Sequence, residues 1–206
     1  VYHQQSLGIL LEIDNLENLS IVYGNLALLE HHIGDNTLAL DHAQRGVELA
    51  VETDNRRAQA YTLTSQGHAL FGLERQEDAF NAYHQAASLW RELGKFSLLL
   101  EPLAGMGRVN MARSEFNQAI STVEEILTLF AEHTLGGTKE PILVFLTCYQ
   151  TLLANQDNRA RDILRTAFKF IEQTAANITE EKLVKTFKEN ISAHRYIILE
   201  HKKPAT

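Results

Sequence analysis

The stretch QGHALFGLERQEDAFNAYHQAASLW, residues 66–90, contains two helical segments joined by a short polar turn. Its second half carries apolar side chains at the three- and four-residue spacing of an amphipathic helix: Ala79, Ala82, Tyr83, Ala86, Ala87 and Trp90. The turn ERQE, residues 74–77, separates this helix from an earlier segment at 57–72. The pattern therefore predicts a helical hairpin.

This hairpin pattern recurs with a period of about 40 residues, which indicates a repeat architecture. Three columns of equivalent residues stay in register: Ala39, Ala79, Ala119 and, after a one-residue slip, Ala160; Ile9, Leu49, Leu89 and Leu129; Glu12, Glu52, Glu92 and Glu132. We expect repeats at 16–55, 56–95, 96–136 and 137–176. The second helix of a truncated repeat is expected at 1–15, and a C-terminal capping helix with a tail at 177–206.

Turn and packing residues support the hairpins. Gly34 and Asn155 are expected to adopt the left-handed conformation that ends a helix, and Asp35 or Asp157 to cap the next one. Asn15, Asn55 and Lys95, which follows Gly94, occupy the corresponding helix ends in other repeats. Small residues are expected where helices cross: Ala27, Gly67, Gly107, Cys148, Ala39, Ala79, Ala119, Ala160, Gly46, Ala86 and Ala167. The glutamate column falls opposite the buried face and is expected to face solvent.

The stretch 66–90 resembles the tetratricopeptide repeat (TPR), with Gly67, Ala79, Tyr83 and Ala86 at its signature positions. The usual TPR unit is shorter, at about 34 residues, so the longer period is similar to the variant of bacterial signal-transduction ATPases and kinesin light chains. Residues 101–127 and 185–195 resemble the C-terminal end of such bacterial regulators. The resemblance implies an all-α fold, a right-handed superhelical solenoid of antiparallel hairpins with about ten helices. Because residues 2–13 align with the second helix of a hairpin whose first helix is absent, we expect the chain to be a segment of a longer solenoid.

Composition excludes several classes of function. The net charge of −7 and the absence of a basic stripe argue against direct nucleic-acid binding. No apolar run is long enough to span a bilayer, and no signal peptide is recognisable, so we expect a cytoplasmic protein without membrane contact. The single cysteine, Cys148, is expected to be a small buried residue rather than a reactive thiol.

The sequence contains no recognisable catalytic or cofactor motif. His31 and His32 are adjacent, so on a helix they point about 100° apart and cannot chelate one ion well. GGTKEP at 136–141 lacks the spacing of a phosphate loop, and GMGRVN at 105–110 lacks the third glycine of a dinucleotide fingerprint. We therefore expect no enzymatic activity, no cofactor and no metal site.

The TPR resemblance implies a concave face, lined by the first helices, that takes up partner peptides. Equivalent positions form three columns: Gly24, Thr64, Ala104 and Phe145; Leu28, His68, Arg108 and Tyr149; His31, Phe71, Met111 and Leu152. The candidate groove residues are Leu28, His31, Tyr61, Thr64, His68, Phe71, Arg108, Met111, Phe145 and Tyr149. For any one of them, packing against the next repeat is an equally good interpretation.

These inferences predict a non-enzymatic protein-interaction or sensor domain of a larger bacterial regulatory protein. Its concave face would bind a protein, a peptide or a small inducer. The alternative is a structural spacer or self-association module, which would hold an attached effector domain in a homo-oligomer.

Overall fold

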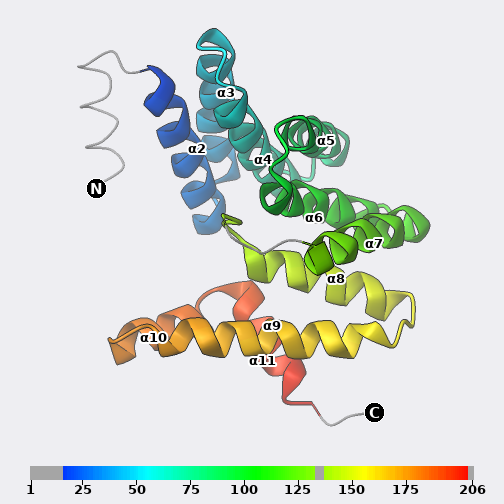
Figure 1. Ribbon diagram of the computed structural model, residues 1–206. Coiled ribbons are helices and arrows are strands. Elements are labelled where there is room, and N and C mark those ends of the chain that lie inside the picture. The colour runs from blue at the N-terminus through cyan, green and yellow to red at the C-terminus, as the bar shows by residue number, and fades with distance from the viewer. Residues whose placement is uncertain (1–15, 133–136, 204–206) are drawn as a thin grey trace.

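The computed structural model describes residues 16–132 and 137–203, which form ten α-helices and no strand (Figure 1). The helices are α2 (Leu16–Ile33), α3 (Asn36–Glu52), α4 (Arg56–Gly72), α5 (Gln76–Glu92), α6 (Phe96–Ala112), α7 (Phe116–Glu132), α8 (Pro141–Ala154), α9 (Arg159–Ala176), α10 (Glu181–Glu189) and α11 (Ser192–His201). None of these helices is both long and apolar enough to cross a membrane.

The first eight of these helices pair into four hairpins that stack in chain order. Each hairpin joins two consecutive helices, from α2–α3 to α8–α9, and each first helix also packs on the next first helix: α2 on α4, α4 on α6, and α6 on α8. Figure 1 shows the stack running from α2 and α3 at one end to α9–α11 at the other. The prediction of an all-α solenoid is confirmed.

A left-handed residue follows six of the described helices, namely α2 to α6 and α8. Positive φ angles occur at Gly34, Asp54, Glu74, Gly94, Ser114 and Gln156. The next residue then donates its backbone N–H to a carbonyl five positions earlier, as from Asn55 to Ala50 at 2.8 Å. These are the left-handed geometry and 6→1 bond of the Schellman motif. The positions from Gly34 to Ser114 are evenly spaced along the chain, so both helices of the α2–α3 hairpin and of the α4–α5 hairpin end in the same way.

The structure corrects some of the expected turn residues. Gly34 is left-handed as predicted, but Asn155 (φ −91°) and Asn55 (φ −87°) are not. Gln156 and Asp54 take that conformation instead, because the 6→1 bond requires it one residue beyond the C-cap. Asn55 caps the next helix by accepting the N–H of Ala58 at 3.0 Å.

Of the remaining turn predictions, those for Asp35 and Asp157 agree with the structure, and the one for Lys95 does not. Asp35 caps α3 as predicted, by accepting the N–H of Leu38 at 3.1 Å. Asp157 accepts the N–H of Arg159 at 2.9 Å, in the first turn of α9. Lys95 has φ −101° and leaves the left-handed position to Gly94, and Asn15 lies outside the described residues.

The expected small residues are buried where the helices cross, including Ala39, Ala79 and Ala119, each 0% exposed. The fully buried Tyr83 depends on two glycines of neighbouring first helices. A Cβ atom at Gly67 of α4 or at Gly105 of α6 would lie 2.5 Å from its ring. Both helices can therefore approach Tyr83 only because these positions lack side chains.

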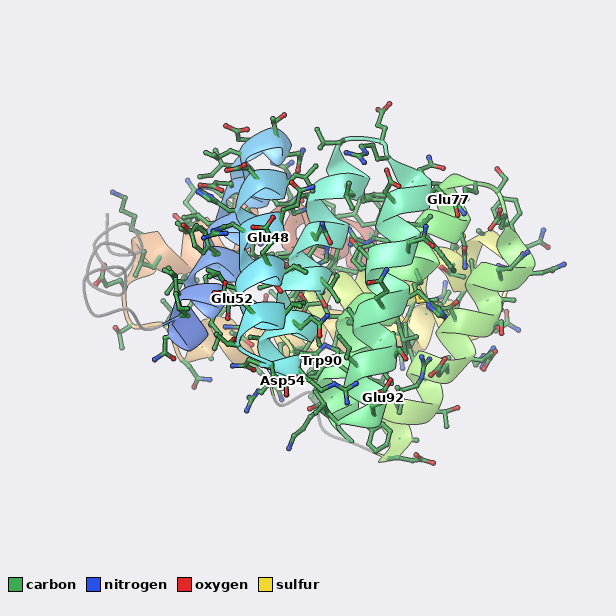
Figure 2. All side chains as sticks on the ribbon, turned by 90° about the horizontal axis from the view of Figure 1, so that it is seen from above. Glu48, Glu52, Asp54, Glu77, Trp90 and Glu92 are labelled. Atoms are coloured by element: carbon green, nitrogen blue, oxygen red, sulfur yellow. The ribbon has the colours of Figure 1, made fainter. Side chains whose placement is uncertain are left out.

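Three members of the glutamate column, Glu52, Glu92 and Glu132, are exposed as predicted, and Glu12 lies outside the described residues. Figure 2 shows Glu48 and Glu52 on α3 and Glu77 and Glu92 on α5. Glu92 forms an ion pair with Arg56 of α4. Arg91 of α5 and Glu125 of α7 join neighbouring hairpins with a distance of 2.7 Å between nitrogen and oxygen.

Two short helices, rather than the single capping helix expected, follow the last hairpin. Asn190 ends α10, and Ile191 has extended backbone (ψ 116°), so the chain changes direction before α11. This turn lets Ala193 and Ile197 pack on α8 and α9, in a core cluster that also contains Ile142 and Ile171. The last hairpin is thereby covered by α11.

Candidate functional site

The predicted groove residues separate into half-exposed and buried groups. His31 of α2, Phe71 of α4 and Met111 of α6 are all half-buried and lie one repeat apart, and we call them the first-helix row. Leu28 is also half-buried. The row therefore presents one large side chain from each of three adjacent helices.

Four other predicted groove residues are buried: Thr64, His68, Phe145 and Tyr149. Phe145 packs with its ring centroid 5.1 Å from that of Phe130, inside the cluster under α11. Tyr149 belongs to the main core, and its hydroxyl donates to Glu200 Oε2 at 3.3 Å. Thr64 is 4% exposed and donates its hydroxyl to the backbone carbonyl of Ala60. The structure thus places Phe145 and Tyr149 in packing positions away from the first-helix row.

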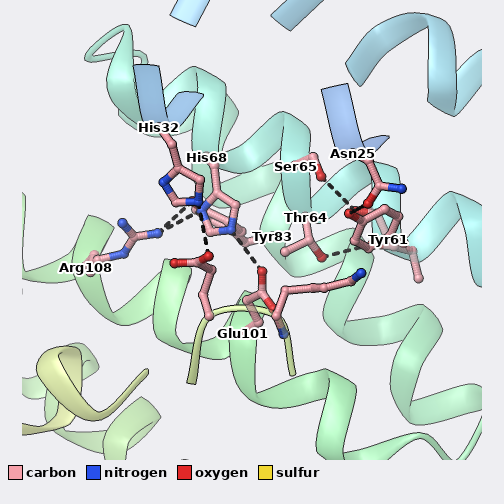
Figure 3. Close-up of polar contacts among 12 residues, drawn as sticks. Asn25, His32, Tyr61, Thr64, Ser65, His68, Tyr83, Glu101 and Arg108 are labelled. Atoms are coloured by element: carbon pink, nitrogen blue, oxygen red, sulfur yellow. Dashed lines mark hydrogen bonds and ion pairs between the residues drawn. The ribbon is translucent and has the colours of Figure 1, made fainter. Parts of the chain in front are cut away.

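A buried chain of hydrogen bonds connects α6, α5 and α4 behind the first-helix row (Figure 3). Arg108 Nη2 donates to the Tyr83 hydroxyl at 3.1 Å, and that hydroxyl lies 2.8 Å from His68 Nδ1. On its other side, His68 Nε2 lies 3.3 Å from Glu101 Oε1.

Burial lowers the pKa of His68, which is 1% exposed, so the neutral ring is favoured. A neutral ring with its proton on Nε2 can donate to Glu101 while Nδ1 accepts from Tyr83. Each hydrogen bond in the chain then has one donor and one acceptor.

This chain holds side chains of the candidate groove. The guanidinium carbon of Arg108 lies 5.1 Å from the ring centroid of Phe71, a cation–π geometry. His31 stacks on His68 with 5.6 Å between ring centroids and 15° between ring planes. Burial is the largest cause that lowers the pKa of His31 from 6.5 to about 4. His31 is thus held by stacking on His68, and Arg108 is held by the Tyr83 hydroxyl and by His68 Nδ1, which lies 3.0 Å from Arg108 Nη2.

The segment 137–140 lies across the same region and joins three helices. Thr138 Oγ1 donates to the carbonyl of Ser97 at 2.7 Å, and Lys139 N donates to Glu101 Oε2 at 3.1 Å. Glu140 Oε1 lies 3.1 Å from His32 Nε2 of α2, and this hydrogen bond raises the pKa of His32. The Lys139 ammonium lies 5.7 Å from the ring centroid of Tyr61.

A cavity of about 490 Å³ lies beside this segment, between the N-terminal halves of α4 and α6. We call it the α4–α6 cavity. Its lining includes Ile21, Tyr61 and Glu101, which occupy equivalent positions on three first helices. The Tyr61 hydroxyl donates to Asn25 Oδ1 at 2.7 Å, and burial raises the pKa of Tyr61.

Sequence reasoning identified part of this site. Tyr61 was among the predicted groove residues, and extending its column by one repeat in each direction would have reached Ile21 and Glu101. Tyr83 was predicted only as a packing residue, and its hydroxyl bond to His68 had no sequence signal. Residues 137–140 also had none, because they do not recur in the other repeats.

No protein-family model matches the sequence, and no curated protein matches it significantly. Solved structures of similar fold include BtubC (BKLC) from P. vanneervenii, with 14% identity, a TM-score of 0.66 and coverage of 98% of this chain and 87% of that chain. Two structures of TPR-like repeats assigned to a kinesin light chain of Podosopora anserina each have 12% identity and a TM-score of 0.59. They cover 91% and 92% of this chain, and 94% and 99% of theirs. The chain thus has the fold of TPR-like helical-repeat proteins.

Proposed function

We propose that this chain is a non-enzymatic repeat scaffold that holds a segment of a partner protein against its first helices. The observation that carries this proposal is the first-helix row: His31, Phe71 and Met111 are half-exposed at equivalent positions of α2, α4 and α6. An extended partner segment lying across these helices would meet one large side chain from each.

The chemistry of the row suits protein recognition. Aromatic, methionine and arginine side chains are enriched in protein–protein interfaces and contribute much of their binding energy. Arg108 is already oriented by Tyr83 and lies over Phe71. Because these side chains are held before a partner arrives, binding requires less ordering of the scaffold.

The wider context that we propose is a sensor or docking domain of a larger bacterial regulatory protein in the cytoplasm. The long repeats and the resemblance of residues 101–127 to the C-terminal part of such regulators support this context. In such a protein, catalysis would belong to other domains. The partner would be another protein or a peptide, and a small inducer could bind at the same face.

Affinity capture with the isolated chain as bait tests the first-helix row. We expect partners captured by the parent chain to be lost with the Phe71→Ala/Met111→Ala double variant. The control is Phe116→Ala, which removes an exposed aromatic side chain (44% exposed) at the start of α7. Equal capture by the double variant and the parent, with helicity retained in both, would overturn the proposal.

The second candidate is a structural spacer that self-associates through its ends. Exposed apolar side chains at the two ends of the stack favour it, such as Leu29 and Ile33 on α2 and Leu199 on α11. Light scattering separates the two functions. A stable dimer that captures no partner would support the spacer, whereas a monomer that captures partners through the first-helix row would support the scaffold.

A further inference from the structure

We propose that the α4–α6 cavity is a binding site for a small organic anion, a carboxylate or phosphate attached to a compact apolar group. This site goes beyond the proposed scaffold function. The cavity lies at the N-terminal ends of α4 and α6, whereas Phe71 and Met111 lie at their C-terminal ends. Either proposal can therefore fail while the other stands.

The cavity has a buried floor and a charged rim. Ala58, Thr64 and Trp90 on the floor are 1%, 4% and 3% exposed. The side chains of Arg57 and Lys95 on the rim are exposed. A volume of about 490 Å³ is within the range of small-molecule pockets, which are mostly apolar with a few placed polar groups.

Three cations converge on the rim without a carboxylate partner. Arg57, Lys95 and Lys139 all line the cavity, and within the described residues none of them forms an ion pair. Other arginines of this acidic chain are paired, including Arg56 with Glu92 and Arg91 with Glu125. Three unpaired cations around one concavity favour an anionic ligand, because that ligand would supply the missing charge.

Among the described residues that line the cavity, Glu101 is the one carboxylate, and its single negative charge leaves an excess of positive charge from Arg57, Lys95 and Lys139. Both oxygens of Glu101 are already engaged, Oε1 with His68 Nε2 and Oε2 with the N–H of Lys139. Glu101 therefore holds the 137–140 segment beside the cavity. In doing so it places Lys139 at the rim, which Arg57 and Lys95 also line.

The ends of two helices add to the positive potential. Helices α4 and α6 both begin at the cavity, which is lined there by Asn55, Arg57, Ala58, Lys95, Ser97 and Leu98. The N-terminus of a helix carries a partial positive charge that attracts anions. Tyr61, Trp90 and Leu98 supply the apolar surface for the body of the ligand. Because positive potential and apolar surface lie side by side in this cavity, the proposed ligand carries both a negative charge and a compact apolar group.

Fluorescence of the intact chain provides a direct test, because Trp90 is its one tryptophan and lines the cavity (Figure 2). The probes are cyclohexanecarboxylate, cyclohexyl phosphate and the neutral cyclohexanecarboxamide, followed by tryptophan emission and by calorimetry. We expect saturable binding of at least one anion, about tenfold tighter than binding of the amide. The tighter of the two anions identifies the ligand as a carboxylate or a phosphate.

Variants show where the probe binds. Arg57→Gln/Lys95→Gln removes two rim cations and should weaken anion binding about tenfold or more, with helicity unchanged. Lys169→Gln, which removes an exposed cation on α9, is the matched control and should bind like the parent. Ser97→Phe places a ring in the cavity without changing its charge and should also abolish binding.

Three outcomes would overturn the proposal. The first is equal affinity for the anions and the amide, and the second is no saturable change with any probe. The third is anion binding that survives both Arg57→Gln/Lys95→Gln and Ser97→Phe in folded protein.

Discussion

Tyr83 shows how much depends on single side chains in this fold. Its ring is completely buried between Gly67 and Gly105, and its hydroxyl connects Arg108 to His68. One residue therefore contributes both to helix packing and to the orientation of a candidate groove residue. A change that displaces the ring should affect both properties.

Gly67→Ala should destabilise the protein by about 1–3 kcal/mol, because the added Cβ would lie 2.5 Å from the Tyr83 ring in a packed core. Urea unfolding measures the change. Gly107→Ala is the control, since its Cβ would lie 3.2 Å from Thr147 Cγ2 and 3.9 Å from Thr122 Cγ2, away from Tyr83, and alanine favours a helix by about 1 kcal/mol. If both variants lose the same stability, crowding of Tyr83 is not the cause.

The histidines of the inner network predict a pH dependence of stability. The pKa of His31 is lowered to about 4 in the folded protein, so between pH 6.5 and 4 the unfolded chain binds the proton more readily. The contribution of His31 to the free energy of unfolding is therefore fully present above about pH 7, and it is lost as the pH falls toward 4. The raised pKa of His32 acts in the opposite direction.

His31→Gln should therefore reduce the stability lost between pH 7.5 and pH 5, by on the order of 1 kcal/mol. Urea unfolding at the two pH values checks this, with His84→Gln at an exposed position of α5 as the control. An unchanged pH dependence in His31→Gln would show that other groups cause the loss.

Among the secondary-structure elements, the helix ends show the repeat most clearly, because the same turn recurs at them. One residue takes the left-handed conformation, and the next both closes the 6→1 bond and begins the following helix. Glycine fills the left-handed position at 34 and 94, whereas Asp54, Glu74, Ser114 and Gln156 fill it with a side chain. A left-handed conformation costs roughly 1–2 kcal/mol for most residues. Four turns are thus locally strained.

Glu74→Gly should relieve this strain and raise the free energy of unfolding by up to about 1 kcal/mol, while Gly94→Ala should lower it by a similar amount. A Cβ at Gly94 would meet no atom within 4 Å, so its effect reports backbone conformation alone. Thermal unfolding measures both. Glu74→Ala removes the side chain but keeps the strained backbone, so its free energy of unfolding should stay close to that of the parent. An increase as large as that of Glu74→Gly would contradict this explanation.

At the scale of the whole molecule, packing is between neighbours in the stack, so stability should be distributed along it. Ile197 of α11 is 0% exposed and packs only in the cluster formed with α8 and α9. Removing it should loosen that end of the stack and leave the other end intact, as expected for repeats that contact only their neighbours.

Ile197→Ala should cost about 2–5 kcal/mol locally and speed amide hydrogen exchange in α8–α11 without changing exchange in α2–α5. Hydrogen exchange with mass spectrometry resolves the two regions. Leu199→Ala, on the same helix but 56% exposed, is the matched control. Faster exchange throughout the chain would show instead that the stack unfolds as one unit.

The helical hairpins, their order and the buried small residues could be predicted from the sequence, because these features are local and recur from repeat to repeat. The position of residues 137–140 could not, and it is known from the folded structure alone. These residues occur once, and Glu140 reaches His32 across 108 residues of sequence, a pairing that no periodic pattern encodes. Their position depends on which groups the folded helices leave available, above all the second oxygen of the buried Glu101. The cavity and its cationic rim follow from that placement.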